Sequence, residues 1–434
     1  MEKKLLIFAC LLSFFGCRQV SVNSETTEDT SVNASVMHIK IEGFDGNTVL
    51  RYSDVFESVR FIKLETTNSC LIGNIDKIIA TKDKFVIMDT SSAKTVLVFD
   101  QDGKFLNIIG TNGAGPEEYD HPSDIAYDKY EDELLVLCYS RRTILRFKLD
   151  GSFKGKITLE HKFNSMFVTS ENTCIVYFNN NTQSNGKKND HNIAIINKEG
   201  DIIEHLLPYD ANVGKLSPPR PIFSTFENQV IFSPYFFNTV YSLNESEITS
   251  KYYLDFGTRG IPRSVYKDKS LPELMKIINN GDYAYNIASF ETSSHIISQF
   301  IYKRQLFDCF YSKETGNTKI AAVYLNDMLN VSTGRRNFFP FGDSLISCVE
   351  PETMASFKEL IKKMKDEKKE LNDVLYSHLF PSASPIIVDK KLKDNYMSLL
   401  ESTKISLSEE EIDFINSIDE MDNPILLIAK PKKI

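Results

Sequence analysis

The chain has 434 residues, of which 42% are hydrophobic and 11% aromatic, with 30 Phe and 19 Tyr but no Trp. A chain of this size buries a large core, and the abundance of Phe and Tyr favours a β-rich interior. The formal net charge of −9 at pH 7 argues against a nucleic-acid partner, because nucleic-acid-binding proteins carry a basic surface.

The N-terminus has the pattern of a secretory signal. Two lysines precede the apolar run 5–15, which is followed by Gly16 and Cys17. The run is too short for a transmembrane helix, which needs about 20 apolar residues. A Gly-Cys pair at this place resembles a bacterial lipobox, so residues 1–17 are predicted to be a lipoprotein signal peptide that directs lipidation of Cys17. The alternative is an ordinary signal peptide with an incidental cysteine.

Residues 18–50 are predicted to be a flexible tether and lead-in to a folded domain that occupies residues 51–434. Residues 18–35 are rich in Ser, Thr, Asn, Glu and Asp and poor in apolar side chains, a composition that cannot build a core. Acyl chains on Cys17 would anchor the domain to a membrane without a transmembrane helix.

A strand–turn–strand sequence pattern recurs along the first half of the domain. Its turns lie at Asp102-Gly103, Asp150-Gly151 and Glu199-Gly200, so the glycines are 48 and 49 residues apart. Glycine suits such turns because it adopts positive φ without a Cβ clash. A period of this length, with several short strands in each unit, is typical of a β-propeller blade.

The strand patterns divide the domain into six blades. The predicted strands are 72–79, 84–89, 95–100 and 104–109 in the first blade; 123–127 and 133–137 with the turn at 150–151 in the second; 165–168 and 174–178 with the turn at 199–200 in the third; 223–226, 229–232 and 239–243 in the fourth; 296–302 and 306–311 with a turn at 315–316 in the fifth; and 337–341, 344–348 and 423–430 in the sixth.

The later blades are interrupted by helical patterns, at about 260–285 and 351–420. Apolar residues at 3–4 spacing begin the second insertion, and Ser408 with Glu411 forms a capping-box pattern near its end. The sixth blade lacks an outermost strand, whereas residues 59–65 form a strand without a partner, and pairing the two termini would remove both open edges. The predicted fold is therefore all-β, a six-bladed β-propeller with terminal strand closure and helical insertions in the later blades.

The chain resembles the six-bladed β-propeller lipoproteins of Gram-negative bacteria, which are related in pattern to NHL-repeat propellers. The residues that carry this resemblance are 61–67, 71–75, 109–119, 238–243 and 423–427. Ala114 departs from the longer polar residue that is usual in the family. The resemblance implies a secreted, membrane-tethered propeller and no settled activity, and fold alone does not define function.

A glycine-rich segment, Gly110–Tyr119, resembles a phosphate-binding loop only superficially. It lacks the Lys-Ser/Thr pair that follows such a loop, and no helix pattern follows it. We interpret it as a crossover from the first blade to the second.

The metal-ligating residue types show no shared blade position. The seven histidines are scattered, and the five cysteines after Cys17 are far apart, which argues against a zinc site or a disulfide framework. Asp124, Asn164 and Asp343 lie near inner strands and could hold calcium at the axis, although turn and capping roles explain them equally well. No cofactor is therefore predicted, with calcium or zinc as the open alternative.

The candidate binding residues are Arg220, Phe223, Tyr235 and Arg304, together with Asp124. Most of them lie in proline- and aromatic-rich segments, and Arg and aromatic residues on loops at a propeller mouth are typical anchors for a protein or peptide. Ordinary packing between blades is the alternative for each of them.

The sequence thus favours a lipid-anchored module of the cell envelope that binds or scaffolds rather than catalyses. A periplasm-facing location is favoured, with the choice between inner membrane, outer membrane and cell surface left open. Its predicted partner is an envelope protein or peptide, or a glycan, and no nucleic acid. The competing hypothesis is a metal-dependent lyase or lactonase-like hydrolase with an axial site.

Overall fold

The computed structural model describes residues 36–180, 183–184, 187–188, 190–208, 220–244, 246–266, 269–329, 337–367, 370–379, 390–403 and 405–433. The predicted signal peptide, its Cys17 and the tether 18–35 lie outside these residues. Within the described part, no helix has the length and apolar character needed to cross a membrane.

Strands dominate the described part of the chain, and most of them form six sheets of four or five strands, numbered here in chain order. Sheet 1 contains β4 (Lys77–Ala80), β5 (Lys84–Asp89), β6 (Thr95–Asp100) and β7 (Phe105–Ile108). Sheet 2 contains β10 (Asp124–Asp128), β11 (Glu133–Cys138), β12 (Thr143–Lys148) and β13 (Phe153–Thr158). Sheet 3 contains β14 (Ser165–Ser170), β15 (Thr173–Tyr177), β18 (His191–Asn197) and β19 (Ile202–Pro208).

The second half of the chain continues the pattern with three further sheets, one of which has a fifth strand. Sheet 4 contains β20 (Phe223–Phe226), β21 (Gln229–Phe232), β22 (Thr239–Leu243), β23 (Ile248–Asp255) and, at its edge, β1 (Met37–Lys40). Sheet 5 contains β24 (Ala284–Glu291), β25 (His295–Tyr302), β26 (Gln305–Ser312) and β27 (Thr318–Ala321). Sheet 6 contains β29 (Phe339–Phe341), β30 (Ser344–Val349), β31 (Ile425–Pro431) and β3 (Phe56–Lys63).

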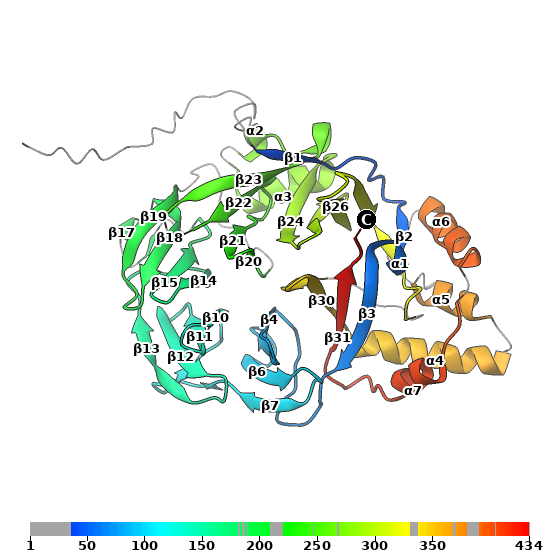
Figure 1. The fold of residues 1–434 in the computed structure, drawn as a ribbon, viewed down its shortest axis with the longest axis horizontal. Helices are drawn as coiled ribbons and strands as arrows, with labels where there is room; N and C mark the ends of the chain where they lie inside the picture. Colours follow the sequence, from blue (N-terminus) through cyan, green and yellow to red (C-terminus); the bar gives the residue numbers. More distant parts are fainter. Residues whose placement is uncertain are drawn as a thin grey trace, which may run out of the picture. The chain divides into compact units, whose positions relative to one another are not determined.

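The sheets follow one another in chain order around a common centre, as Figure 1 shows. The first strands of neighbouring sheets contact each other, for example β4 with β10, β10 with β14 and β20 with β24. Each first strand is therefore the innermost one, and the architecture is that of a β-propeller. The predicted bounds of β5, β6, β20, β21 and β22 are confirmed to the residue.

The first strand of sheet 5 differs from the prediction. The sequence pattern assigned 296–302 as the first strand of the fifth blade, but that segment is the second strand, β25, and the first is β24. All but one residue of β24 is buried. A strand that is covered on both faces shows no alternation of apolar and polar residues. Polar residues also interrupt the apolar run of β24, and for these reasons β24, which adjoins the predicted insertion, was not recognised as a strand.

Residues 36–50 are also more ordered than the predicted flexible lead-in. Strand β1 pairs in parallel with β23, from Met37 opposite Tyr252 to Lys40 opposite Asp255. A second short strand, β2 (Val49–Arg51), pairs with β28 (Val323–Leu325). The side chain of Phe44, between the two strands, is 1% exposed. These residues are part of the domain, whose described portion therefore begins at residue 36.

The helices gather in two places. The 3₁₀-helix η1 (Gly257–Arg259), α2 (Arg263–Tyr266) and α3 (Leu271–Asn280) connect sheets 4 and 5, whereas α4 (Pro351–Glu367), α5 (Leu371–Leu379), α6 (Lys390–Glu401) and α7 (Glu409–Asn416) connect β30 to β31. The latter four lie beside β3, β31 and the single-turn helix α1 (Tyr52–Val55). The predicted capping box is confirmed, because Ser408 Oγ accepts a hydrogen bond of 3.2 Å from the Glu411 backbone N–H.

The glycines at the repeated turns lie where neighbouring sheets pack against each other. Gly103 has a φ of +85°, and a Cβ atom added to it would lie 2.3 Å from the carbonyl oxygen of Lys63 in sheet 6. The turns of the next two sheets pack in the same way. Cβ atoms added to Gly151 and Gly200 would lie 3.0 Å and 3.2 Å, respectively, from a carbonyl oxygen of the preceding sheet. Each turn thus packs on the outermost strand of the sheet before it, and only glycine fits there.

Candidate functional site

The candidate site lies at the end of the sheets where the innermost strands begin, which we call the entrance end. The backbone N–H of Met166, at the start of β14, donates to Asp124 Oδ2 at the start of β10, over 2.9 Å. Lys77 at the start of β4 also reaches Asp124. The starts of the innermost strands of sheets 1, 2 and 3 are therefore adjacent, and polar groups of three sheets meet there.

A buried ion pair occupies this position. Lys77 Nζ lies 2.8 Å from Asp124 Oδ1 and donates a second hydrogen bond, of 2.7 Å, to the carbonyl oxygen of Ile125. Asp124 is 0% and Lys77 8% exposed. Burial lowers the pKa of Lys77, and the nearby Arg220 lowers it further, whereas Asp124 opposes both effects. Each carboxylate oxygen of Asp124 is thus engaged, one by an ammonium group and the other by a backbone N–H.

Arg220 approaches the same pair from the segment that precedes β20. Its Nη2 donates to the carbonyl oxygen of Ser123 over 2.5 Å. Its Nε lies 3.9 Å from Asp124 Oδ1, too far for a hydrogen bond, and this buried N–H has no partner among the described residues. The side chain is 25% exposed. The cluster of Lys77, Asp124 and Arg220, called here the central charge cluster, therefore holds two cations and one carboxylate.

Tyr235 belongs to the loop between β21 and β22, which also lies at the entrance end. Its ring packs on Phe236 and Tyr285, with centroids 4.2 Å and 6.0 Å away. Phe236 has a φ of +73°, which is unusual for a bulky residue. Two hydrogen bonds hold it there: its N–H donates to Asn286 O over 3.0 Å, and its carbonyl accepts from Tyr266 Oη over 2.9 Å. The loop is thereby fixed between β24 and α2.

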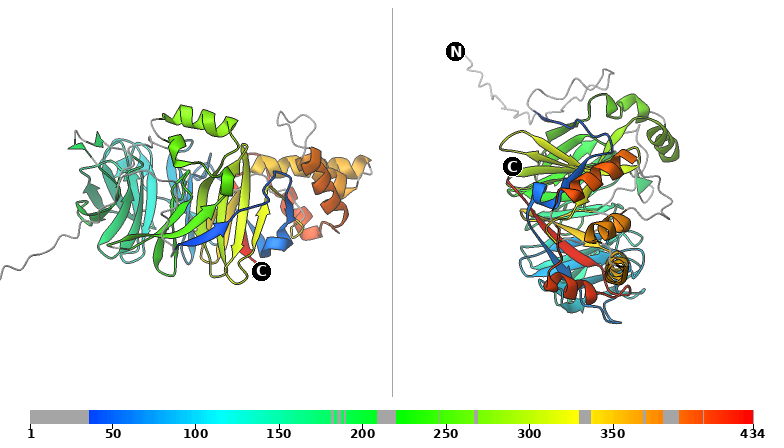
Figure 2. Two further views of the ribbon diagram at one scale, coloured as in Figure 1. Left: turned by 90° about the horizontal axis from the view of Figure 1, so that it is seen from above. Right: turned by 90° about the vertical axis from the view of Figure 1, so that its right-hand side faces the viewer.

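Helices α2 and α3 cover part of this end. Ile261, Tyr266, Leu274 and Ile278 form a buried cluster with Phe236 and Tyr285. Figure 2 (left) shows α3 standing out from one side of the sheets. The predicted insertion at 260–285 thus supports the aromatic loop at the entrance end.

The remaining predicted binding residues lie in two different environments. Arg304 is exposed in the turn between β25 and β26, and this turn lies at the entrance end because Ala284, which begins β24, pairs with Tyr302. Phe223 is 5% exposed and packs on Phe232, with ring centroids 5.5 Å apart. The structure brings Arg220 and Asp124 together and places Tyr235 and Arg304 at the same end, but it places Phe223 in the core.

The three carboxylate and amide residues considered for calcium do not converge. Asp343 lies at the opposite end of the sheets, where its carboxylate accepts hydrogen bonds from Ser293 N (2.8 Å) and Ser293 Oγ (2.7 Å). Asp124 is engaged by Lys77. Among the described residues, no group of three or more His, Cys, Asp or Glu side chains is placed to hold a metal ion, and the five described cysteines are all free thiols.

Lys77 was missed by sequence reasoning, although a signal for it existed. Lys77 and Asp124 each begin the innermost strand of their sheet. Aligning the repeats on these strands places a lysine and an aspartate at equivalent positions of adjacent blades. A charge that begins an otherwise buried strand needs a partner, and the equivalent position of the next blade supplies it.

The glycine-rich segment is confirmed as a crossover. Strands β8 (Thr111–Asn112) and β9 (Glu118–Tyr119) pair with each other within it. Glu118 Oε2 accepts a hydrogen bond of 2.7 Å from Gly115 N, and Arg141 donates to the carbonyl oxygen of Glu118 over 2.7 Å. The loop binds its own carboxylate and leaves no cradle for phosphate.

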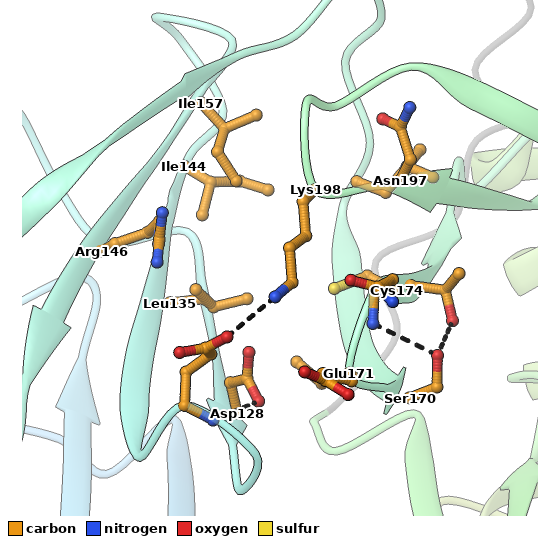
Figure 3. Close-up of a pocket in the computed structure, with 15 residues that line it drawn as sticks. Asp128, Leu135, Ile144, Arg146, Ile157, Ser170, Glu171, Cys174, Asn197 and Lys198 are labelled. Carbon is orange, nitrogen blue, oxygen red and sulfur yellow. Dashed lines mark hydrogen bonds and ion pairs between the residues drawn. The ribbon is translucent and has the colours of Figure 1, made fainter.

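A cleft between sheets 2 and 3 is the other concave feature that we considered (Figure 3). Its floor is apolar and its rim is charged: Lys198 reaches across the cleft to Glu131 over 2.8 Å, and Arg146 pairs with Glu133. The open space is about 30 Å³, far below the several hundred Å³ of a typical ligand pocket. The cleft is therefore a packing seam between two sheets rather than a ligand site.

The fold and the site thus define an all-β propeller with a charged centre. Residues 35–389 match the family described as "Domain of unknown function (DUF4934)", and the chain belongs to that family. The fold is similar to that of a Bacteroides fragilis protein assigned as exported, with 18% identity and a TM-score of 0.68 over 92% of this chain and 100% of the other.

Two further solved structures show weaker similarity. Virginiamycin B lyase from Staphylococcus aureus, solved with quinupristin, is 13% identical, with a TM-score of 0.39 over 68% of this chain and 84% of the other. BamB from Moraxella catarrhalis is 9% identical, with a TM-score of 0.34 over 67% of this chain and 76% of the other. No curated protein matches the chain.

Proposed function

We propose that the chain is a non-catalytic binding module of the cell envelope, a six-bladed propeller anchored by a lipid on Cys17 that holds an envelope protein or peptide at its entrance end. Support for six blades comes from the number of sheets and from the pairing of β3 with β31, which runs from Phe56 opposite Pro431 to Lys63 opposite Ile425. In this proposal the strand pairing in sheet 6 joins the two ends of the domain into a ring, so that no sheet is left incomplete.

The observation that carries the binding role is the composition of the entrance end. The side chain of Arg220 is partly exposed, Arg304 is exposed, and Tyr235 is presented by a loop that two hydrogen bonds fix. Arg and Tyr on a rigid framework are the residue types that dominate binding energy at protein interfaces. The described residues at this end show hydrogen bonds and ion pairs suited to recognition and no group of metal-ligating side chains.

The test is photocrosslinking in the intact envelope. A benzophenone amino acid replaces Arg304 in one variant and Lys82 in another; both are exposed turn residues, but Lys82 lies between β4 and β5 at the opposite end. We expect a discrete crosslinked partner from position 304 and none from position 82. Equal crosslinking from both positions, or crosslinking from position 82 alone, contradicts the proposal. Stoichiometric calcium or zinc in the same preparation would favour the competing lyase or hydrolase hypothesis.

The lipid anchor gives a separate prediction. Cys17→Ala should abolish incorporation of an alkyne-labelled fatty acid, because Cys17 is the proposed acyl acceptor. Cys10→Ala is the matched control, since Cys10 lies inside the apolar run of the signal, and it should retain the label. Label that persists in Cys17→Ala, or that is absent from the unmodified protein, refutes lipidation at this residue.

A further inference from the structure

The central charge cluster is unbalanced. It holds two cations, Lys77 and Arg220, and a single carboxylate, Asp124. The closest approach of Arg220 to that carboxylate is 3.9 Å, and within the described part of the chain this is its only ion pair. Cations that are removed from water are normally paired with anions. Counted over the residues that the structure describes, the cluster therefore lacks one negative charge, and the cation with the weaker pairing is Arg220.

The protein does not supply the missing charge through Asp124. One carboxylate oxygen of Asp124 is bound by Lys77 Nζ at 2.8 Å and the other by Met166 N at 2.9 Å. Lys77 is also engaged a second time, by the carbonyl oxygen of Ile125. Both members of this pair are fixed by their other contacts, and neither is free to move toward the guanidinium group.

The orientation of Arg220 suits an external anion. Its Nη2 is tied to the carbonyl oxygen of Ser123, and its Nε is enclosed on the side of Asp124. The side chain is nevertheless 25% exposed. A guanidinium group that is anchored at one nitrogen has a fixed plane, and its remaining N–H groups are then pre-arranged for the two oxygens of a carboxylate.

We propose that Arg220 binds a carboxylate of the peptide or protein ligand. The inference rests on the proposed function, because it specifies the chemical group that the entrance end recognises. The excess of one positive charge matches one carboxylate. A phosphate group carries up to two charges and normally recruits several cations, whereas Lys77 is only 8% exposed and is already paired with Asp124, which leaves Arg220 as the partly exposed cation of the cluster. The carboxylate belongs either to the C-terminus of the ligand or to an Asp or Glu side chain.

The experiment measures retention of random hexapeptide pools on the immobilised mature protein. One pool carries a free C-terminal carboxylate and no Asp or Glu, a second carries a C-terminal amide with Asp and Glu included, and a third has a C-terminal amide and neither acidic residue. We expect the third pool to be retained at least tenfold less than one of the first two. The pool that is retained identifies the source of the carboxylate.

Variants attribute the effect to Arg220. Arg220→Gln should reduce retention of the carboxylate pool at least tenfold, and Arg220→Lys should restore part of it, because lysine keeps the charge but loses the planar fork. Arg60→Gln is the matched control with the same change of charge, on exposed strand β3, and should leave retention unchanged. Should Arg220→Gln fail to fold, competition on the unmodified protein gives the same answer: N-acetylglycine should displace the pool, and N-acetylglycinamide should not.

Several results overturn this inference: equal retention of all three pools, retention of none, undiminished retention by Arg220→Gln, or displacement by N-acetylglycinamide as effective as by N-acetylglycine. None of these results contradicts the proposed function, which the photocrosslinking experiment tests separately. A partner that crosslinks at position 304 and still binds Arg220→Gln supports the binding role and refutes the carboxylate. A protein without any crosslink at the entrance end refutes the binding role itself.

Discussion

Asp124→Ala is expected to lower the free energy of unfolding by about 3–5 kcal/mol, the cost of leaving a buried charge without its partner. The substitution removes the carboxylate that lies 2.8 Å from Lys77 Nζ and the acceptor of the Met166 N–H. Lys77 is only 8% exposed, so water cannot replace the lost partner fully. Urea unfolding of the mature protein, followed by far-UV circular dichroism, measures the change.

Asp83→Ala is the matched control. Asp83 also pairs with a lysine, Lys84, but its side chain is 67% exposed, and exposed pairs of this kind contribute no more than about 1 kcal/mol. The double variant Lys77→Met/Asp124→Leu should be less destabilised than the sum of the two single variants, because it removes both charges together. A loss below 1 kcal/mol for Asp124→Ala, or strict additivity in the double variant, shows that the pair does not stabilise the centre.

The sequence could predict the features that depend on local patterns, and it could not predict those that depend on contacts between distant residues. Strands that form continuous apolar runs next to a marked turn, such as β5 and β6, were located to the residue because the run and the turn are local properties. Strand β24 is also buried on both faces, but polar residues interrupt its apolar run and it adjoins the predicted helical insertion, so it was missed. Strand β1 was missed because its partner lies more than 200 residues away, from Tyr252 to Asp255, and no local pattern specifies such a pairing.

The candidate site was predicted in part for the same reason. Arg220 and Asp124 were selected for their residue type and blade position, but their contact across sheets was not visible without the ring of sheets that brings strand starts together. Phe223 was selected as a binding residue because prolines and an arginine precede it, although the strand that it begins was predicted correctly; the structure buries it at 5% exposure. The sequence thus located the strand boundary, but it did not show on which side of that boundary side chains become part of the core.

Gly103→Ala is expected to be among the most destabilising single methyl additions in the chain, at about 3 kcal/mol or more. The positive φ of +85° costs a residue with a Cβ about 1–2 kcal/mol. The new Cβ would also lie 2.3 Å from the carbonyl oxygen of Lys63, and relieving this overlap requires a backbone shift that adds about 1–3 kcal/mol. Gly316→Ala is the control, because Gly316 has a φ of +72° but no neighbour closer than 3.8 Å.

The comparison between junctions tests the proposed ring. Gly103 packs sheet 1 against β3 of sheet 6, the strand whose pairing joins the two ends of the domain, whereas Gly151 packs sheet 2 against sheet 1. If the ring is closed, the junction at Gly103 cannot open without breaking strand contacts. Gly103→Ala should therefore lower the free energy of unfolding, measured in urea, at least as much as Gly151→Ala does. Amide exchange in β3 and β31 should also accelerate in the Gly103 variant. If Gly103→Ala lowers the free energy of unfolding no more than Gly316→Ala does, sheets 1 and 6 separate easily, and the closed six-bladed ring is then wrong.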